Sequence, residues 1–244
     1  MTGRAAGAPL SGVRGVTYDL WRTLVRDRDS AHTDELRRER LGALLELHPA
    51  EVGRILDDIR TFRHAEWSEH RAPTPALMVQ HALAAYGDLP EPALVERVVD
   101  CVGAATRDAG VELLPGAMET LAVLADSGVP VGLICDVGIT SGAITREMLD
   151  SLGLSGVITT VVLSDEIGVP KPYRAPFAAA LAALGVPAAS AVHVGDLRRK
   201  DVAGGATSGV HSVRYRGDHD DAGEGPEAEF VIDRHADLLP LLGL

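Results

Sequence analysis

Three acidic residues and one lysine are spaced along this 244-residue chain so that they could act together on a phosphoryl group. Asp19 and Asp196 each follow a short apolar run, Asp201 comes five residues after Asp196, and Lys171 lies between the two runs. Carboxylates are hard oxygen ligands for Mg²⁺, and lysine supplies a compact positive charge for the same anion. A carboxylate can also attack phosphorus and form an aspartyl-phosphate. The set therefore predicts metal-assisted phosphoryl transfer, provided that the fold brings these residues together.

The elements that must position these residues are short runs that are apolar or β-branched almost throughout. Such runs are typical of strands buried on both faces. The predicted strands are residues 13–18, 129–135, 157–163, 191–194 and 210–213, and helical patterns at 116–127 and 176–184 alternate with them. This alternation predicts an α/β fold with a doubly wound parallel sheet, a Rossmann-like core. Ligands bind such sheets at the carboxyl ends of the strands, where the polar residues lie.

Residues 28–111 depart from this alternation, because they carry helical patterns and no convincing strand. Apolar residues recur at helical spacing from Val52 to Phe62 after Pro49, a residue that suits a first helical turn, and again within residues 90–105. We expect a helical cap at 28–111 and an α/β core formed by 13–27 and 112–244. Residues 1–12 are expected to be a flexible tail, and the acidic residues 218–229 a mobile surface loop.

The charge balance argues against a nucleic-acid partner, because the formal net charge is −12 and the longest basic run is residues 198–200. Two cysteines, Cys101 and Cys135, allow at most one disulfide. No apolar run approaches the roughly 20 residues that cross a bilayer, and we expect no targeting segment. These features predict a cytoplasmic protein without a membrane partner.

The order of these residues resembles the four motifs of the haloacid dehalogenase (HAD) superfamily. Asp-x-x-x-Thr stands at residues 19–23, a polar strand end at 135–136, Lys-Pro at 171–172 and Gly-Asp-x-x-x-x-Asp at 195–201. The resemblance extends from about residue 13 to 242 and includes the inserted cap. It implies a hydrolase, most simply a Mg²⁺-dependent phosphatase acting on a small phosphorylated metabolite. A homodimer formed through the caps is one option that the sequence leaves open.

The resemblance also implies a role for each residue of the motifs. Asp19 would be the nucleophile, and Lys171 would neutralise the charge that it shares with the phosphoryl oxygens. Asp201 would ligate the metal or orient its waters. The residues implied in catalysis are Asp19, Thr23 and Lys171, those implied in substrate binding are Trp21, Cys135 and Asp136, and those implied as Mg²⁺ ligands are Asp19, Asp196 and Asp201.

Three positions depart from the family's pattern. Trp21 stands where family phosphatases carry a second aspartate, the general acid for the leaving alkoxide, and an indole N–H is no proton source near neutral pH. General acid catalysis contributes about 10²–10⁴ in rate. Simple alkyl phosphates should therefore be poor substrates unless another group replaces the acid, and His64 or His70 in the cap is our candidate. Arg22 replaces a glycine and Cys135 a serine or threonine.

Two other functions remain open beside the phosphatase. A dehalogenase forms an ester on its aspartate without metal and carries an aromatic residue at the position of Trp21, but it lacks the metal motif that is intact here. The third function is a catalytically weakened domain that binds a ligand or partner through the cap. A phosphonate-cleaving enzyme needs a cap lysine, and residues 28–111 contain none.

Overall fold

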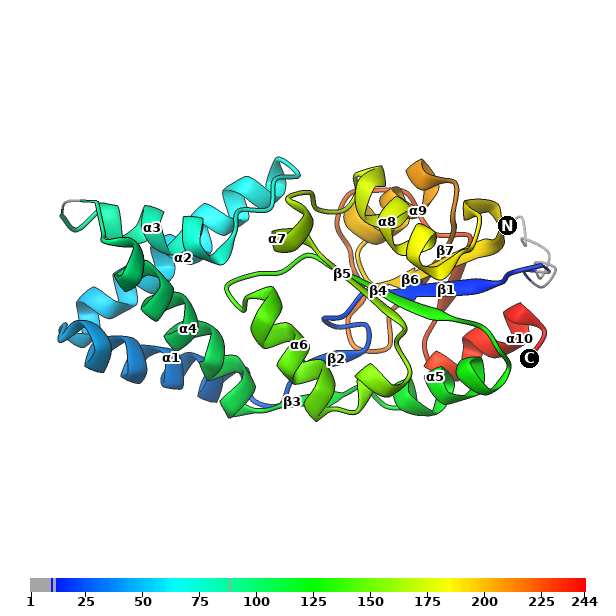
Figure 1. Cartoon of the computed structure of the whole chain (residues 1–244), viewed down its shortest axis with the longest axis horizontal. Coiled ribbons are helices and arrows are strands. Elements are labelled where there is room, and N and C mark those ends of the chain that lie inside the picture. Colours follow the sequence, from blue (N-terminus) through cyan, green and yellow to red (C-terminus); the bar gives the residue numbers. More distant parts are fainter. Residues whose placement is uncertain (1–9, 11, 88) are drawn as a thin grey trace.

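A six-stranded parallel sheet forms the centre of the molecule in the computed structural model, which describes residues 10, 12–87 and 89–244 (Figure 1). The predicted tail at residues 1–12 lies mostly outside the described residues. The strand order is β5-β4-β1-β6-β7-β8. The strands are β1 (Gly15–Tyr18), β4 (Val131–Cys135), β5 (Thr160–Leu163), β6 (Ala191–Gly195), β7 (His211–Tyr215) and β8 (Phe230–Ile232). The predicted α/β class with a doubly wound parallel sheet is confirmed.

Helices cover both faces of this sheet (Figure 1). One face carries α8 (Arg174–Leu184) and α9 (Ala203–Ser208), and the other carries α5 (Ala117–Asp126), α6 (Gly142–Ser151) and α10 (Leu238–Leu242). Shorter elements are α7 (Ser164–Ile167), a π-helical turn (Arg198–Val202) and 3₁₀ turns at Leu154–Gly156, Ala188–Ser190 and His235–Asp237. The two faces are packed by separate apolar clusters, so the sheet is buried on both sides, as the apolar runs predict.

The central strand β1 places the candidate nucleophile. All four of its residues are buried, and it pairs in parallel with β4 on one side and β6 on the other. Asp19, Asp136 and Asp196 each follow the last residue of one of these three strands. Parallel strands end at the same edge of a sheet, so this topology gathers the three carboxylates at one place.

Four helices between residues 30 and 109 form a bundle beyond the carboxyl ends of the strands (Figure 1). They are α1 (Ser30–Leu45), α2 (Pro49–Ser68), α3 (Pro75–Ala84) and α4 (Pro92–Ala109). Pro49 occupies the first turn of α2, and the His48 side chain accepts the Ala50 N–H, which stabilises that end. The bundle has its own apolar cluster, which includes Leu41, Ile55 and Val98. We propose that this bundle is the cap.

A short antiparallel ribbon connects the bundle to the core, and sequence patterns do not predict it. It consists of β2 (Val25–Asp27) and β3 (Val111–Leu113). The chain enters the bundle through β2 and returns through β3. Each strand has three residues, which is too short for an alternating pattern to be recognised. The three-residue strand β8 is unpredicted for the same reason.

The acidic segment at residues 218–229 is irregular, as expected, but its side chains make specific ion pairs. Arg214 in β7 is buried beneath it, 2% exposed, and pairs with Asp220 at 2.7 Å and with Glu227 at 2.8 Å. Asp221 accepts the Arg198 N–H at 2.8 Å, at the start of the π-helical turn. These contacts anchor the segment beside the site. The expectation of a mobile loop does not take them into account, because it does not foresee that the buried Arg214 requires the carboxylates of this segment to balance its charge.

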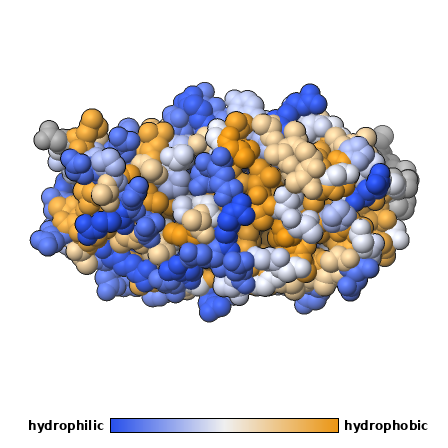
Figure 2. All heavy atoms as spheres, viewed as in Figure 1, coloured by the Kyte–Doolittle hydropathy of each residue, from blue (hydrophilic) through white to orange (hydrophobic). Residues whose placement is uncertain are grey.

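The outer surface of the helical bundle is mainly hydrophilic. On the face seen in Figure 2, hydrophilic residues cover most of the helical bundle. No helix in the described part of the chain is long and apolar enough to span a membrane.

His235 should make stability depend on pH. The ring is fully buried and stacks on Tyr215 at 4.3 Å between centroids, and burial lowers the pKa of His235 to about 4. The unfolded chain therefore binds a proton that the folded chain excludes, and stability is lost as the pH falls from about 6.5 toward 4. Between pH 7 and pH 5 the wild type should lose about 2 kcal/mol more than His235→Phe, measured by urea unfolding.

The control for this measurement is His64→Gln, because His64 lies exposed on α2. It should keep the wild-type pH dependence. Equal slopes for the wild type and His235→Phe would show that the buried ring makes no contribution.

Candidate active site

The Lys171 ammonium lies at the centre of the strand-end residues. It is 2% exposed and donates hydrogen bonds to Asp19 Oδ1 at 2.5 Å, to Asp201 Oδ1 at 2.7 Å and to the Ile134 carbonyl at 3.0 Å. Its backbone N–H donates to Asp136 Oδ1 at 2.9 Å. One cation therefore connects the ends of β1 and β4 to the π-helical turn after β6.

Hydrogen bonds to both carboxylate oxygens fix the position of Asp201. Besides Lys171, its Oδ1 contacts His193 Nε2 at 3.0 Å, and its Oδ2 accepts the Leu197 N–H at 3.0 Å. The His193 Nδ1 lies 2.9 Å from Thr17 Oγ1, so the chain of contacts continues into β1. A Cβ added to Gly195 would overlap the Asp201 carboxyl carbon. Glycine at this position is what allows the carboxylate to approach the end of β6 so closely.

The electrostatics of the cluster indicate more negative charge than Lys171 can balance. Burial and the neighbouring Asp201 raise the pKa of Asp19 to about 7, against the opposing effect of Lys171. Burial, Asp19 and Asp201 together raise the pKa of Asp196 to about 9. Asp201 is buried too, but Lys171 and His193 hold its pKa well below the usual range. A further cation beside Asp19 and Asp196 would favour the ionised form of both carboxylates.

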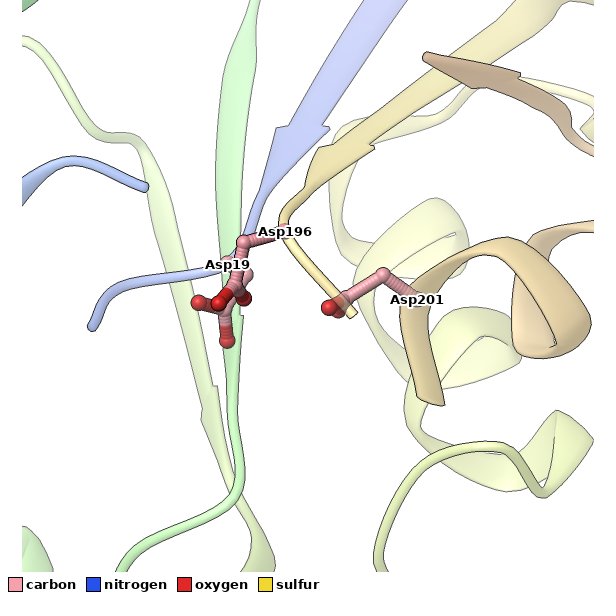
Figure 3. Close-up of side chains that lie close together, drawn as sticks. All are labelled: Asp19, Asp196 and Asp201. Atoms are coloured by element: carbon pink, nitrogen blue, oxygen red, sulfur yellow. The ribbon is translucent and has the colours of Figure 1, made fainter. Parts of the chain in front are cut away.

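The three aspartates fit a divalent cation. Asp19, Asp196 and Asp201 each offer a carboxylate oxygen, and these oxygens lie within 4.8 Å of one another. Figure 3 shows the Asp19 and Asp196 carboxylates side by side at the strand ends, with Asp201 directed toward them from the helical turn. Hard oxygens in this number suit Mg²⁺, which keeps several waters. Because both Asp201 oxygens accept other hydrogen bonds, this residue suits the role of orienting those waters.

A cavity of about 490 Å³ opens in front of Asp19, between the core and the helical bundle. Five of the predicted residues line it: Asp19, Trp21, Asp136, Lys171 and Asp196. Thr23, Cys135 and Asp201 do not line it and are buried behind it, and the Thr23 hydroxyl has no hydrogen-bond partner in the described residues. Burial and the charge of Asp19 raise the pKa of the Cys135 thiol well above its usual value. Contacts of Thr23 and Cys135 with a transferring group stay predictions.

The candidate acids His64 and His70 lie away from this cavity. His64 is exposed on α2 and lines no part of it. His70 follows the end of α2, has φ 56° and faces a second cavity, where its ring meets the edge of Tyr173. The side chains that α2 does direct into the site are Arg63 and Trp67. The structure therefore does not support either histidine as a substitute acid.

Lys200 is one of the pocket residues that sequence reasoning missed. It is 1% exposed, donates to the Lys171 carbonyl at 2.9 Å and lies 4.8 Å from the centre of the Trp67 ring. Burial lowers the pKa of Lys200 to about 8, although Asp136, 3.9 Å away, opposes this shift. A signal was available, since Lys171 and Lys200 are the only lysines in the sequence and every other basic residue is arginine or histidine.

Arg22 adopts a left-handed backbone conformation, with φ 60°. Family members carry glycine here, and glycine takes this conformation without strain, whereas other residues do so at a cost. The same turn directs Trp21 and Arg22 toward the cavity. Arg22 therefore adopts at this turn a backbone conformation that favours glycine.

The chain is similar to known hydrolases in sequence and in fold. Residues 61–215 match the family model described as haloacid dehalogenase-like hydrolase. A phosphoglycolate phosphatase from Pectobacterium atrosepticum is 30% identical over 97% of this chain and 95% of its own length. A glyceraldehyde 3-phosphate phosphatase from Methanopyrus kandleri is 29% identical over 94% and 97%. The crystal structure of a 2-haloacid dehalogenase from Pseudomonas syringae has a TM-score of 0.72 at 24% identity, covering 95% of this chain and 98% of its own, which shows the shared fold.

The chain therefore belongs to the haloacid dehalogenase-like hydrolases. The resemblance recognised from the motifs is confirmed, and with it the assignment of the chain as a hydrolase.

Gly195→Ala should damage both the fold and the site. The added methyl group would overlap the Asp201 carboxylate, which Lys171, His193 and the Leu197 N–H prevent from moving away. We expect a loss of about 1–3 kcal/mol in the free energy of unfolding, measured by urea denaturation. Gly53→Ala, in the middle of α2 with open space around its Cβ, should instead gain up to about 1 kcal/mol. An unchanged stability of Gly195→Ala would mean that the carboxylate is free to shift.

Proposed function

We propose that this protein is a Mg²⁺-dependent phosphatase that hydrolyses a small phosphorylated metabolite through an aspartyl-phosphate on Asp19. The observation that carries the proposal is the position of Asp19. Its carboxylate faces a 490 Å³ cavity, is fixed by Lys171 at 2.5 Å, and has Asp196 and Asp201 beside it. The phosphatases among its relatives support the same reaction class.

In the first step, an Asp19 oxygen attacks phosphorus, a new P–O bond forms, and the bond from phosphorus to the leaving oxygen breaks. Lys171 neutralises part of the negative charge that gathers between the carboxylate and the phosphoryl oxygens. Mg²⁺, bound by Asp19 and Asp196 with Asp201 orienting its waters, would supply further positive charge to those oxygens. In the second step, water hydrolyses the acyl phosphate and releases inorganic phosphate and free Asp19.

Trp21 sets a limit on the leaving group. The indole lines the cavity where family phosphatases carry their acid, and it cannot protonate a leaving alkoxide. Substrates whose leaving oxygen needs little protonation, such as acyl or aryl phosphates, should therefore react faster than alkyl phosphates. The relatives act by name on phosphoglycolate and glyceraldehyde 3-phosphate, so a bias toward better leaving groups would be a feature of this chain.

The competing function is hydrolytic dehalogenation, which the aromatic residue at position 21 favours. That reaction would form an ester on Asp19 and would need no metal. A cytoplasmic location, the lack of a nucleic-acid partner, a homodimer and a weakened binding domain stay predictions of the sequence.

Asp19→Asn and removal of Mg²⁺ test the proposed reaction. We expect the wild type to turn over an acyl phosphate and an aryl phosphate with Mg²⁺ and to lose this activity in EDTA, with recovery when Mg²⁺ is added back. Asp19→Asn should lose at least about 10³-fold, because the nucleophile is gone. Release of phosphate is the measurement for these substrates, and release of chloride from 2-chloropropionate without metal is the measurement for the competing function. Metal-independent chloride release would replace the phosphatase proposal, and no turnover at all would favour the binding domain.

Trp21→Asp tests the missing acid by restoring it. We expect kcat/KM for an alkyl phosphate to rise by about tenfold or more, within the roughly 10²–10⁴ that a positioned acid contributes. The rate with an aryl phosphate should change little, since its leaving group departs without a proton. Trp21→Phe is the matched control, because it removes the indole N–H but adds no acid. An equal gain in both variants would attribute the effect to space rather than to proton transfer.

A further inference from the structure

The bundle side of the cavity carries a cluster of arginines. Arg37 from α1 and Arg60 and Arg63 from α2 all line it. Two of them already have carboxylate partners. Arg37 pairs with Asp34 at 3.2 Å, and Arg60 pairs with the same Asp34 at 2.9 Å and with Asp57 at 3.0 Å. Within the described residues, Arg63 forms neither an ion pair nor a hydrogen bond.

Arg63 lies in surroundings that do not balance its charge. Burial lowers the pKa of Arg63, and the positive charges of Arg37 and Arg60 lower it further. This burial is partial, because Arg63 keeps enough solvent contact to count as an exposed residue. Asp27, a cavity-lining acid at the end of β2, accepts a hydrogen bond from Thr33, and the charges of Arg37 and Arg22 oppose the rise of its pKa. Arg63 is therefore the one member of the cluster whose charge no carboxylate of the described chain neutralises.

The guanidinium of Arg63 also reaches the core. Its Nη1 lies 3.0 Å from the position that a Cβ on Gly138 would take. Gly138 belongs to the loop after β4 that also carries Asp136, so the arginine tip rests against the wall that holds the catalytic cluster. The same cavity thus contains the nucleophile from the core and an unneutralised guanidinium from the bundle.

We propose that Arg63 binds a second anionic group of the substrate, a carboxylate or a second phosphate, while the phosphoryl group that is removed lies against Asp19. This inference rests on the proposed phosphatase function. Guanidinium binds carboxylate and phosphate through two parallel hydrogen bonds, which makes the contact both strong and directional. A chain with a net charge of −12 otherwise repels a doubly anionic metabolite, so a local cluster of arginines matters for its capture.

Matched pairs of substrates test the inference. Phosphoglycolate and 2-hydroxyethyl phosphate differ by one carboxylate, and ribulose 1,5-bisphosphate and ribulose 5-phosphate differ by one phosphate. We expect the wild type to prefer the doubly anionic member of one pair, and the pair that responds identifies the source of the anion. Arg63→Gln should lower kcat/KM for that member by about 10- to 100-fold, mostly through KM, and should leave kcat/KM for the partner that lacks the second anionic group within about twofold. Arg63→Lys should recover part of the loss.

Arg38→Gln is the matched control, because Arg38 lies exposed on α1 and does not line the cavity. It should keep the wild-type preference. Calorimetric binding of the same four compounds to Asp19→Asn, with and without Arg63→Gln, measures the preference in the absence of turnover. A wild type that hydrolyses both members of each pair equally well would overturn this inference and leave the phosphatase intact. Anion preference in binding without turnover of any compound would overturn the phosphatase and keep the anion site.

Discussion

The buried ammonium of Lys171 is the interaction on which the site depends. It joins Asp19 after β1, the Ile134 carbonyl in β4 and Asp201 in the turn after β6. Without it, two buried carboxylates would face each other with no counter-charge, an arrangement that costs several kcal/mol. The close approach of Asp201 to Gly195 and the contact of Asp201 with His193 follow from the same requirement. A cation of fixed position thus sets the geometry of the carboxylates that surround it.

The core and the helical bundle contribute different side chains to the cavity. The core supplies the carboxylates and Lys171, and the bundle supplies arginines and Trp67. The contacts between them include Lys200 against the Trp67 ring and a hydrogen bond from Arg199 to the Ser68 carbonyl. Both come from the π-helical turn that also carries Asp201. The turn that carries Asp201 is therefore also the one that contacts the end of α2.

Much of the core could be predicted from the sequence, because each buried strand is recognised from a short run of neighbouring residues. The buried strands are apolar runs, and the polar residues that follow them are placed by the topology of a parallel sheet. The three-residue strands β2, β3 and β8 are too short for such a pattern. The resemblance to a known family supplied the roles of the residues, which neither periodicity nor composition can supply.

The cap side of the site was less predictable for a different reason. The sequence points to cap residues of the site within residues 63–71, and this segment does reach the cavity. Helical spacing alone, however, does not show which face of α2 is directed toward the core. Arg63 and Trp67, four residues apart, face the cavity, whereas α2 ends at Ser68 and leaves His70 in another conformation. Lys200 belongs to the basic run at 198–200, and such a run is typical of a solvated surface patch. In the structure the π-helical turn buries Lys200, the last residue of this run.

The distribution of lysine has a practical consequence. The sequence contains two lysines, and both are buried at the cavity, Lys171 at 2% and Lys200 at 1% exposure. No lysine side chain therefore lies on the outer surface. Reagents that modify or crosslink lysine amines will find little to react with on the folded protein, and surface attachment through lysine will be inefficient. Any lysine adduct that does form will lie at the cavity in front of Asp19. The extent of lysine acylation thus reports how accessible this cavity is.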